Sequence, residues 1–142
     1  MIRTALAALL FVISPAVAET VDGRESVIID GNTVAFGSER VRIMNIDAPE
    51  TRSAHCEREL VAGLKAKERL AMLLRSGSVE IERDGEDIYG RTLALLDVNG
   101  LDVGQIMIHE GLALPWQKGK DAREDRIWHW CGEKGGAGPQ PP

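Results

Sequence analysis

The sequence predicts an α+β fold that is mostly β. Five short, largely apolar stretches of strand length lie between residues 25 and 98, bounded mainly by Gly, Asn, Asp and Ser. One long amphipathic stretch separates the third from the fourth, and a shorter helical stretch follows the fifth. Five strands with helices at these two places suit a small closed barrel of the OB type with flanking helices. A small open α+β sheet would give the same pattern.

Residues 1–18 have the order of a secretory signal. A basic residue, Arg3, precedes an apolar run over 5–13, and Ala16-Val17-Ala18 forms a small-x-small cleavage site. The run is too short for a membrane span of about 20 residues. We therefore expect an exported product, secreted or periplasmic, that is not held in a membrane after signal removal. An uncleaved N-terminal anchor is the alternative.

The first three strands follow the signal closely. Residues 25–30 and 33–37 predict a hairpin, because apolar β-branched flanks surround Gly31-Asn32, which tolerates the backbone of a tight turn. Residues 39–46 predict a third strand with apolar side chains on both faces.

A helix is expected over residues 56–75. Leu60, Leu64, Ala71 and Leu74 form a stripe near the 3.6-residue period, and Ser76-Gly77 ends it. Most of its charged side chains lie outside this stripe, which is typical of a solvated face.

Two further strands and a short helix complete the expected domain, which covers residues 19–131. Residues 78–83 and 91–98 predict strands four and five, joined by an acidic loop over 84–90. Asp102 and Gln105 have the spacing of a capping box, so a helix should begin there and stop at Gly111. The Gly/Pro-rich residues 132–142 are expected to form a flexible tail.

The two cysteines, Cys56 and Cys131, predict a disulfide in an exported protein. A metal site is the alternative, because each cysteine has a histidine close by in the sequence. Zinc ligands are usually spaced by two to four residues, which His55-Cys56 does not satisfy. The disulfide is therefore favoured.

The overall charge argues against binding to nucleic acid through the bulk field. The chain carries 17 Lys and Arg against 22 Asp and Glu, a net charge of −5 with neutral His, and losing Arg3 makes it more negative. Any binding of a polyanion must rest on a local basic cluster or a bound cation.

Three polar stretches differ from the scaffold: DGNT at 30–33, RIMNIDAPET at 42–51 and DIYGRTLA at 87–94. Taken singly, each has an ordinary structural interpretation. Asp47 and Glu50 could be a helix-capping pair around a proline, and Tyr89-Gly90-Arg91 could be a tight turn. The alternative is one carboxylate to hold a hard cation and one to take a proton.

Together, in this order and spacing, the three stretches resemble the staphylococcal nuclease (thermonuclease-like) family. That family has D-G-D-T at its first hairpin, R-ϕ-x-x-ϕ-D-x-P-E-T after the third strand and D-x-Y-G-R-x-L-A before the fifth. The similarity continues through DVGQIMIHEGLA at 102–113 and covers residues 25–116. It implies the five-stranded OB-type barrel that the periodicity also favours.

The resemblance also implies roles for individual residues in hydrolysis of DNA and RNA with bound Ca²⁺. Asp47 and the carbonyl of Ala48 match metal ligands of the family, and Glu50 matches the residue that activates or orients the attacking water. Arg42 and Arg91 match the two arginines that bind the phosphate, and Tyr89 resembles a phosphate contact. Chemistry agrees, since fixed guanidinium groups and a cation stabilise the charge that develops on a phosphodiester.

Asn32 departs from the family pattern, which has a metal-binding aspartate there. An amide oxygen can still coordinate Ca²⁺ but brings no formal charge, so affinity should fall and activity should be reduced. Asp30 could compensate in part, although alternation along the strand is expected to point it elsewhere.

We therefore expect an exported, monomeric, Ca²⁺-dependent nuclease acting on DNA and RNA. The alternative is a barrel with attenuated catalysis that binds nucleic acid or protein; a structural envelope protein is a third option. Trp116, Trp128 and Trp130 could stack on bases, but packing of the terminal segment is favoured.

Overall fold

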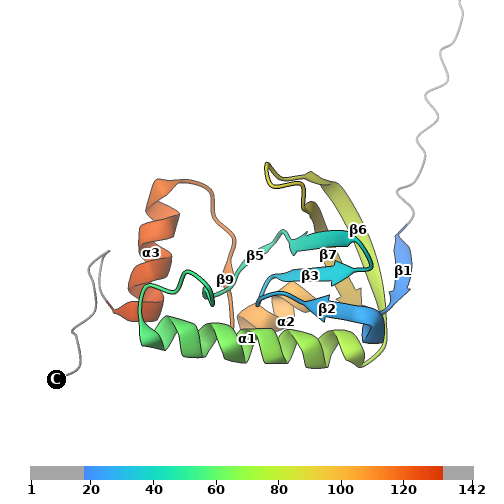
Figure 1. Cartoon of the computed structure of the whole chain (residues 1–142), viewed down its shortest axis with the longest axis horizontal. Helices are drawn as coiled ribbons and strands as arrows, with labels where there is room; N and C mark the ends of the chain where they lie inside the picture. The colour runs from blue at the N-terminus through green and yellow to red at the C-terminus, as the bar shows by residue number, and fades with distance from the viewer. Residues whose placement is uncertain (1–17, 133–142) are drawn as a thin grey trace, which may run out of the picture.

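A curled mixed sheet with helices around it forms the fold, as seen in the computed structural model, which describes residues 18–132 (Figure 1). The predicted signal sequence, apart from Ala18, and the predicted tail, apart from Gly132, lie outside the described residues. Among the helices of the described part, none is both long enough and apolar enough to cross a membrane.

The five predicted strands are present as part of a larger sheet. They are β2 (Ser26–Ile28), β3 (Thr33–Phe36), β4 (Glu39–Ile43), β6 (Ser78–Glu86) and β7 (Thr92–Val98). Two short strands extend the sheet, β1 (Glu19–Asp22) beside β6 and β8 (Leu101–Asp102) beside β7. The order is β1-β6-β7-β4-β3-β2, and β4 runs parallel to β7 while the other pairs are antiparallel. The predicted OB-type α+β fold is therefore confirmed.

The prediction of one continuous strand over 39–46 is wrong. The chain turns at Met44 and Asn45, and β5 (Ile46–Asp47) then pairs with β9 (Leu114–Pro115) in a separate two-stranded ribbon. The Met44 amide donates to the carbonyl of Ala94, and the Trp116 amide donates to the carbonyl of Asn45. The turn thus carries Asp47 away from the main sheet.

The predicted acidic loop over 84–90 is shorter than expected. β6 continues to Glu86 across an irregular register between Arg83 and Glu86, so only residues 87–91 form the connection to β7. Gly85 and Gly90 both have positive φ, which lets the strand end and the chain reverse within this distance.

The two predicted helices are confirmed, with bounds close to those expected, but the apolar stripe predicted for the longer one is wrong in its first half. Leu60 and Leu64 are exposed, and the small residues Gly63 and Ala66 face the core, where the chain approaches closely. α1 (Glu57–Arg75) begins after Cys56, and α2 (Val103–His109) begins after Asp102, whose carboxylate accepts from the amide of Gln105. A short 3₁₀ helix, η1 (Gly23–Glu25), and a C-terminal helix, α3 (Lys120–Cys131), were not predicted.

The core lies between the sheet and α1, which runs beneath β2 and β3 in Figure 1. Its fully buried side chains are mainly aliphatic: Val34, Val41, Ile43, Ile46, Leu70, Leu74, Val79, Ile81, Leu96, Val103 and Met107. On the far side of the β5–β9 ribbon, α3 stands at the N-terminal end of α1 (Figure 1). This leaves α3 facing the strand that carries Asp47.

A disulfide joins Cys56, directly before α1, to Cys131, the last residue of α3. Of the three tryptophans, Trp130 is partly buried, whereas Trp116 and Trp128 are about half exposed. Packing of the C-terminal segment instead depends on Ile127, which is 2% exposed.

Candidate functional site

One polar pocket of about 180 Å³ gathers residues from four distant parts of the chain. Four structural segments supply them: the β2–β3 hairpin, β4 and β5 with the loop that follows, the turn before β7, and α3. Its lining residues are Asp30, Asn32, Arg42, Asp47, Ala48, Pro49, Glu50, Arg91 and Arg126. Six of the predicted site residues therefore meet here: Arg42, Glu50, Arg91, Asn32, Asp47 and Ala48.

Arg42 is held by backbone carbonyls at one edge of its guanidinium group. Its Nη1 donates to the carbonyl of Ile43 (2.5 Å) and to that of Ile46 (2.9 Å). Burial lowers the pKa of Arg42, partly offset by the Asp47 carboxylate, but an arginine stays protonated in proteins. The group is thus a fixed positive charge facing the pocket.

Arg91 is held by Asp87, four residues earlier in the same turn. Its Nε donates to Asp87 Oδ2 (2.7 Å), and its Nη1 lies 3.4 Å from the hydroxyl of Thr33. Tyr89 lies outside the pocket and is 72% exposed, with its ring 5.6 Å from the Arg91 guanidinium carbon. Tyr89 is thus beside the pocket, on an open surface.

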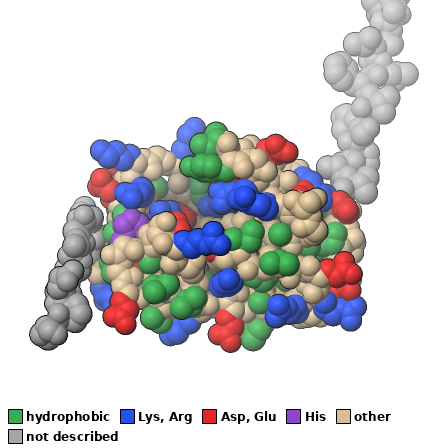
Figure 2. Space-filling view, in the orientation of Figure 1, with side chains coloured by type: hydrophobic (Ala, Val, Ile, Leu, Met, Phe, Trp, Pro, Cys, Tyr) green, Lys and Arg blue, Asp and Glu red, His purple; other side chains and the backbone are tan. Residues whose placement is uncertain are grey.

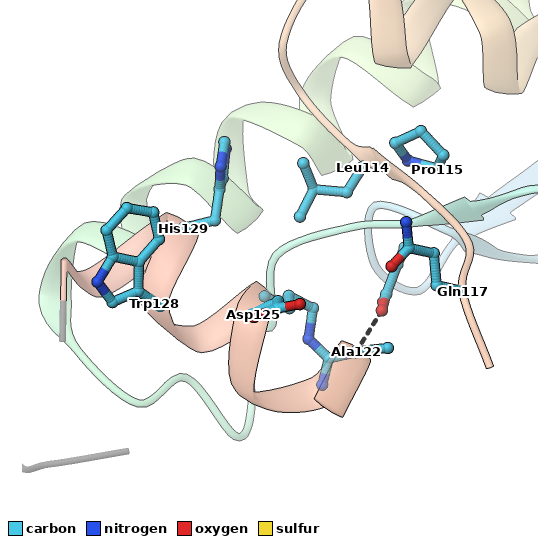
Figure 3. Close-up of a pocket in the computed structure, with 9 residues that line it drawn as sticks. Leu114, Pro115, Gln117, Ala122, Asp125, Trp128 and His129 are labelled. Atoms are coloured by element: carbon cyan, nitrogen blue, oxygen red, sulfur yellow. Dashed lines mark hydrogen bonds and ion pairs between the residues drawn. The ribbon is translucent and has the colours of Figure 1, made fainter. Parts of the chain in front are cut away.

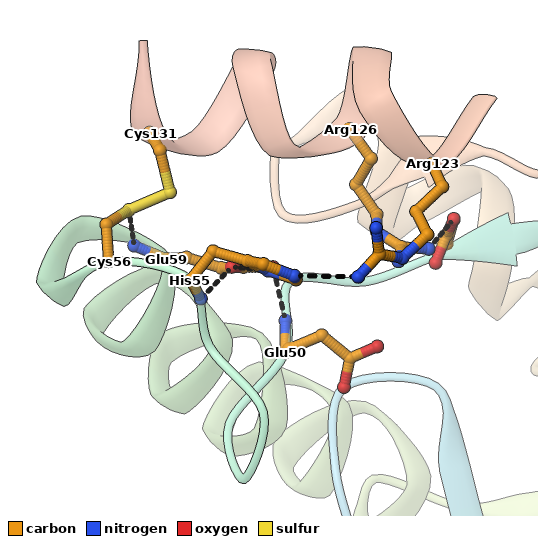
Figure 4. A network of polar contacts seen from close by, with 8 residues as sticks. Glu50, His55, Cys56, Glu59, Arg123, Arg126 and Cys131 are labelled. Carbon is orange, nitrogen blue, oxygen red and sulfur yellow. Dashed lines mark hydrogen bonds and ion pairs between the residues drawn. A yellow bond between two sulfur atoms is a disulfide. The ribbon is translucent and has the colours of Figure 1, made fainter. Parts of the chain in front are cut away.

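Glu50 is positioned by a buried carboxylate that the sequence analysis did not single out. Glu59 is fully buried, and its oxygens accept hydrogen bonds from the Glu50 amide (3.2 Å), the His55 amide (2.7 Å) and His55 Nδ1 (2.9 Å). The Glu50 side chain points away from this network, toward the β2–β3 hairpin (Figure 4). The network therefore fixes the loop that carries Glu50.

Burial raises the pKa of Glu50 above its usual value. The nearby Arg126 guanidinium opposes this shift, and the carboxylates of Asp30, Glu59 and Asp47 add to it. A raised pKa is typical of a carboxylate that takes up a proton during a reaction.

The capping interpretation of Asp47 and Glu50 is wrong, because the helix begins only at Glu57 with Cys56 as its N-cap. Glu59 instead occupies the third helical position, from which its carboxylate reaches back to the preceding amides. The spacing of Glu59, three residues after Cys56, is a capping signal that can be recognised in the sequence.

Asn32 stabilises the hairpin through its amide. In the side-chain orientation that gives both the amide nitrogen and the amide oxygen hydrogen-bond partners, its NH₂ donates to Asp30 Oδ1 (2.9 Å) and Thr33 Oγ1 (3.1 Å), and its oxygen accepts from the Ala48 amide (3.3 Å). The expectation that Asp30 points elsewhere is wrong, because β2 ends at Ile28 and strand alternation does not extend to it. The asparagine thus bridges the hairpin and the loop after β5; an aspartate could also accept from the Ala48 amide but could not donate to Asp30.

The oxygen donors expected for a cation are Asp47, Asn32 and the Ala48 carbonyl. Carboxylate, amide and carbonyl oxygens are ligands that Ca²⁺ takes, so the donor chemistry fits, with one formal negative charge among the three. Residues 18–132 contain no cluster of three or more His, Cys, Asp or Glu side chains that could hold a metal ion.

Arg126 is the pocket residue that sequence reasoning missed. It projects from α3 (Figure 4), and its Nη1 lies 2.5 Å from Asp47 Oδ2. Both residues also line a second pocket, with Leu114, Pro115, Trp128 and His129 (Figure 3). In the sequence it belongs to the mixed charge run KDAREDR, which is typical of a solvated helix face.

The charges of the pocket are balanced. Asp30, Asp47 and Glu50 oppose the three arginines Arg42, Arg91 and Arg126. On the face viewed in Figure 2, Lys and Arg side chains lie in the middle and also around the rim, where most of the acidic side chains lie. The local environment therefore differs from the net negative charge of the chain.

Known proteins resemble this chain over most of its length. A family model described as "Staphylococcal nuclease homologue" matches residues 40–130. Protein ParB of Escherichia coli is 37% identical over 127 residues, which cover 80% of this chain and 67% of ParB. The succinoglycan biosynthesis protein ExoI of Rhizobium meliloti (strain 1021) is 34% identical over 123 residues, 80% of this chain and 61% of ExoI.

A micrococcal nuclease of Shigella flexneri is 27% identical over 154 residues, which cover 91% of this chain and 84% of that nuclease. This chain thus spans between 61% and 84% of the length of these three relatives.

Proposed function

The chain belongs to the family of staphylococcal nuclease homologues, and from this membership we propose that it is an exported, Ca²⁺-dependent nuclease of DNA and RNA. The observation that supports this most is the meeting of Arg42, Arg91 and Glu50 in one pocket. A phosphodiester carries a negative charge that grows as water adds to phosphorus, and fixed cations stabilise that growth.

The arginines bind the phosphate in this mechanism. Carbonyls of Ile43 and Ile46 hold one nitrogen of Arg42, and Asp87 holds Nε of Arg91. The remaining N–H groups of each guanidinium can donate to phosphate oxygens, in the paired geometry that arginine offers. Because both groups are fixed before substrate arrives, little reorganisation is needed during the reaction.

Glu50 acts as the general base. It accepts a proton from a water molecule, the water oxygen attacks phosphorus, and the ester oxygen on the opposite side leaves. The hydrogen bond from the Glu50 amide to buried Glu59 keeps the carboxylate at the pocket. Asp47, Asn32 and the Ala48 carbonyl would hold a Ca²⁺ ion, which would supply charge stabilisation at the phosphate.

The test is cleavage of single-stranded DNA and RNA by the chain lacking residues 1–18, at millimolar Ca²⁺ and with chelator. We expect cleavage with Ca²⁺ and a loss of about 10²–10⁴-fold in kcat for Glu50→Gln, the range for a general base. Glu57→Gln is the matched control, because Glu57 is exposed at the start of α1.

No cleavage above the Glu50→Gln level would contradict the nuclease proposal. Binding of the oligonucleotide without turnover would then support the attenuated binding module instead. Equal cleavage with Ca²⁺ and with chelator would contradict the calcium requirement alone.

A further inference from the structure

The contact between Arg126 and Asp47 is made by two side chains that are largely withdrawn from solvent. Arg126 Nη1 lies 2.5 Å from Asp47 Oδ2, and the two side chains are 16% and 15% exposed. At this burial the pair is screened much less than a surface ion pair. A guanidinium therefore already neutralises the carboxylate that a cation in this pocket would need.

Helix α3 holds Arg126 in this place through anchors on both sides of it. The neighbouring Ile127 is buried, and the disulfide ties Cys131 to Cys56 at the start of α1. Arg123, one turn before Arg126, lies 3.2 Å from His55 through its Nη2 (Figure 4). These anchors fix the helix against the loop that carries Glu50.

The other two expected ligands carry no formal charge, and the two further carboxylates of the pocket have other roles: Asp30 accepts from the Asn32 amide, and Glu50 is the proposed base. Asn32 is neutral and its amide is bonded to Asp30 and Ala48, and the Ala48 carbonyl has no formal charge. Affinity for Ca²⁺ depends strongly on the number of charged ligands. Asp47, the single expected carboxylate ligand, is thus the one that the Arg126 guanidinium contacts. The Nε of Arg126 is buried and has no hydrogen-bond partner in residues 18–132.

We propose that Arg126 is a tethered cation that competes with Ca²⁺ for Asp47, so that α3 sets the calcium affinity of the site. This inference rests on the proposed function for the identity of the ion. Two positive charges on one carboxylate repel each other, so Ca²⁺ can bind tightly only when the guanidinium moves off Asp47. The affinity of the unmodified chain is lowered by the free energy of that movement.

The test is calorimetric titration of the oxidised chain with Ca²⁺ in the absence of nucleic acid. Arg126→Gln should lower the Kd for Ca²⁺ by about tenfold or more, because it frees a charged ligand. Lys120→Gln is the matched control, since Lys120 is an exposed cation at the start of the same helix and does not line the pocket, so Kd should be unchanged. Asp47→Asn should abolish the gain when combined with Arg126→Gln.

An unchanged or raised Kd in Arg126→Gln would overturn the proposal, as would absence of Ca²⁺ binding in both chains. If Arg126→Gln does not fold, the proposal is tested on the unmodified chain by NMR. The side-chain Nε–H resonance of Arg126 should then shift on addition of Ca²⁺, and the absence of a shift would overturn the proposal. The titration contains no nucleic acid, so it is independent of the cleavage assay. Absence of cleavage would not contradict a lower Kd in Arg126→Gln, and an unchanged Kd would not contradict nuclease activity.

Discussion

At the scale of single residues, Asp87 links the turn of DIYGR to the arginine that follows it. Its Oδ1 accepts from the amides of Tyr89 (2.9 Å) and Arg91 (3.0 Å), and its Oδ2 accepts from Arg91 Nε (2.7 Å). Burial opposes ionisation, but these hydrogen bonds win and lower the pKa of Asp87. Asp87 is thus a positioning residue that aims Arg91 at the pocket.

Asp87→Asn should therefore weaken both stability and activity. A lowered folded-state pKa stabilises the fold above the ordinary aspartate pKa of about 3.9, and this stabilisation is lost as the pH falls through the lowered value. At neutral pH we expect a loss of about 1 kcal/mol in the free energy of unfolding and about tenfold in kcat/KM. The measurement is thermal unfolding against pH.

The difference in Tm between the two chains should narrow as the solution is acidified. Asp84→Asn is the control, because Asp84 is exposed on the neighbouring strand and has no side-chain bond in the described residues. A difference in Tm that stays constant or widens as the pH falls would show that Asp87 does not stabilise the fold through its charge.

At the scale of elements, periodicity and caps predict most of the scaffold. The existence of α1, the capping box at Asp102 and the turn residues of the hairpin are local features, so the sequence alone reveals them. The buried face of α1 is not such a feature, because the long side chains of Leu60 and Leu64 are exposed. Arg42, Glu50 and Arg91 could also be predicted, because each lies in a stretch whose composition differs from the scaffold. Their approach in space depends on strand pairing, which the resemblance implied.

Helix α3 and the β5–β9 ribbon could not be predicted in the same way. In α3 only Ile127 is buried, so no apolar stripe marks the helix, and its N-cap Gly119 makes no side-chain hydrogen bond. The ribbon has two residues in each strand, too few for any period to appear. Since Arg126 depends on both elements, its place in the pocket follows from the tertiary structure alone.

The disulfide gives the element-scale prediction. Cys56→Ser with Cys131→Ser opens a connection between residues 75 positions apart, which should lower the free energy of unfolding by about 4 kcal/mol on the chain-entropy model. Because α3 then loses an anchor, Arg126 should leave Asp47 more easily and the affinity for Ca²⁺ should rise. Denaturant unfolding and calorimetric titration measure the two effects.

Adding Arg126→Gln to the double serine chain is the control. If the disulfide acts on calcium through Arg126, the combined variant should gain little beyond Arg126→Gln alone, so the two effects are not additive. A serine chain that is less stable but has unchanged calcium affinity would show that Ile127 and Arg123 suffice to hold the helix.

At the scale of the whole molecule, a compact site with three arginines lies within a negatively charged chain. The net charge is −5, yet three arginines line one pocket, where three carboxylates balance them. Such a protein cannot attract nucleic acid over its entire surface. Its contacts with phosphates should be few and confined to the site.

This distribution predicts a shallow dependence of binding on salt. For single-stranded nucleic acid the slope of log K against log salt is about −0.7 per phosphate contact, so two or three contacts give a slope of about −2. Fluorescence anisotropy with the Glu50→Gln chain and a labelled oligonucleotide measures it without cleavage. Arg91→Gln should make the slope shallower by about 0.7, because one phosphate contact is lost.

Arg75→Gln is the matched control, since Arg75 is exposed at the end of α1 that lies away from α3 (Figure 1). It removes the same charge from the molecule, so it separates a local contact from the overall field. If binding follows the local site, Arg75→Gln should leave the slope unchanged. A slope near −5, or an equal response to both substitutions, would mean that the nucleic acid spreads over a wide surface and that the pocket does not define the binding site.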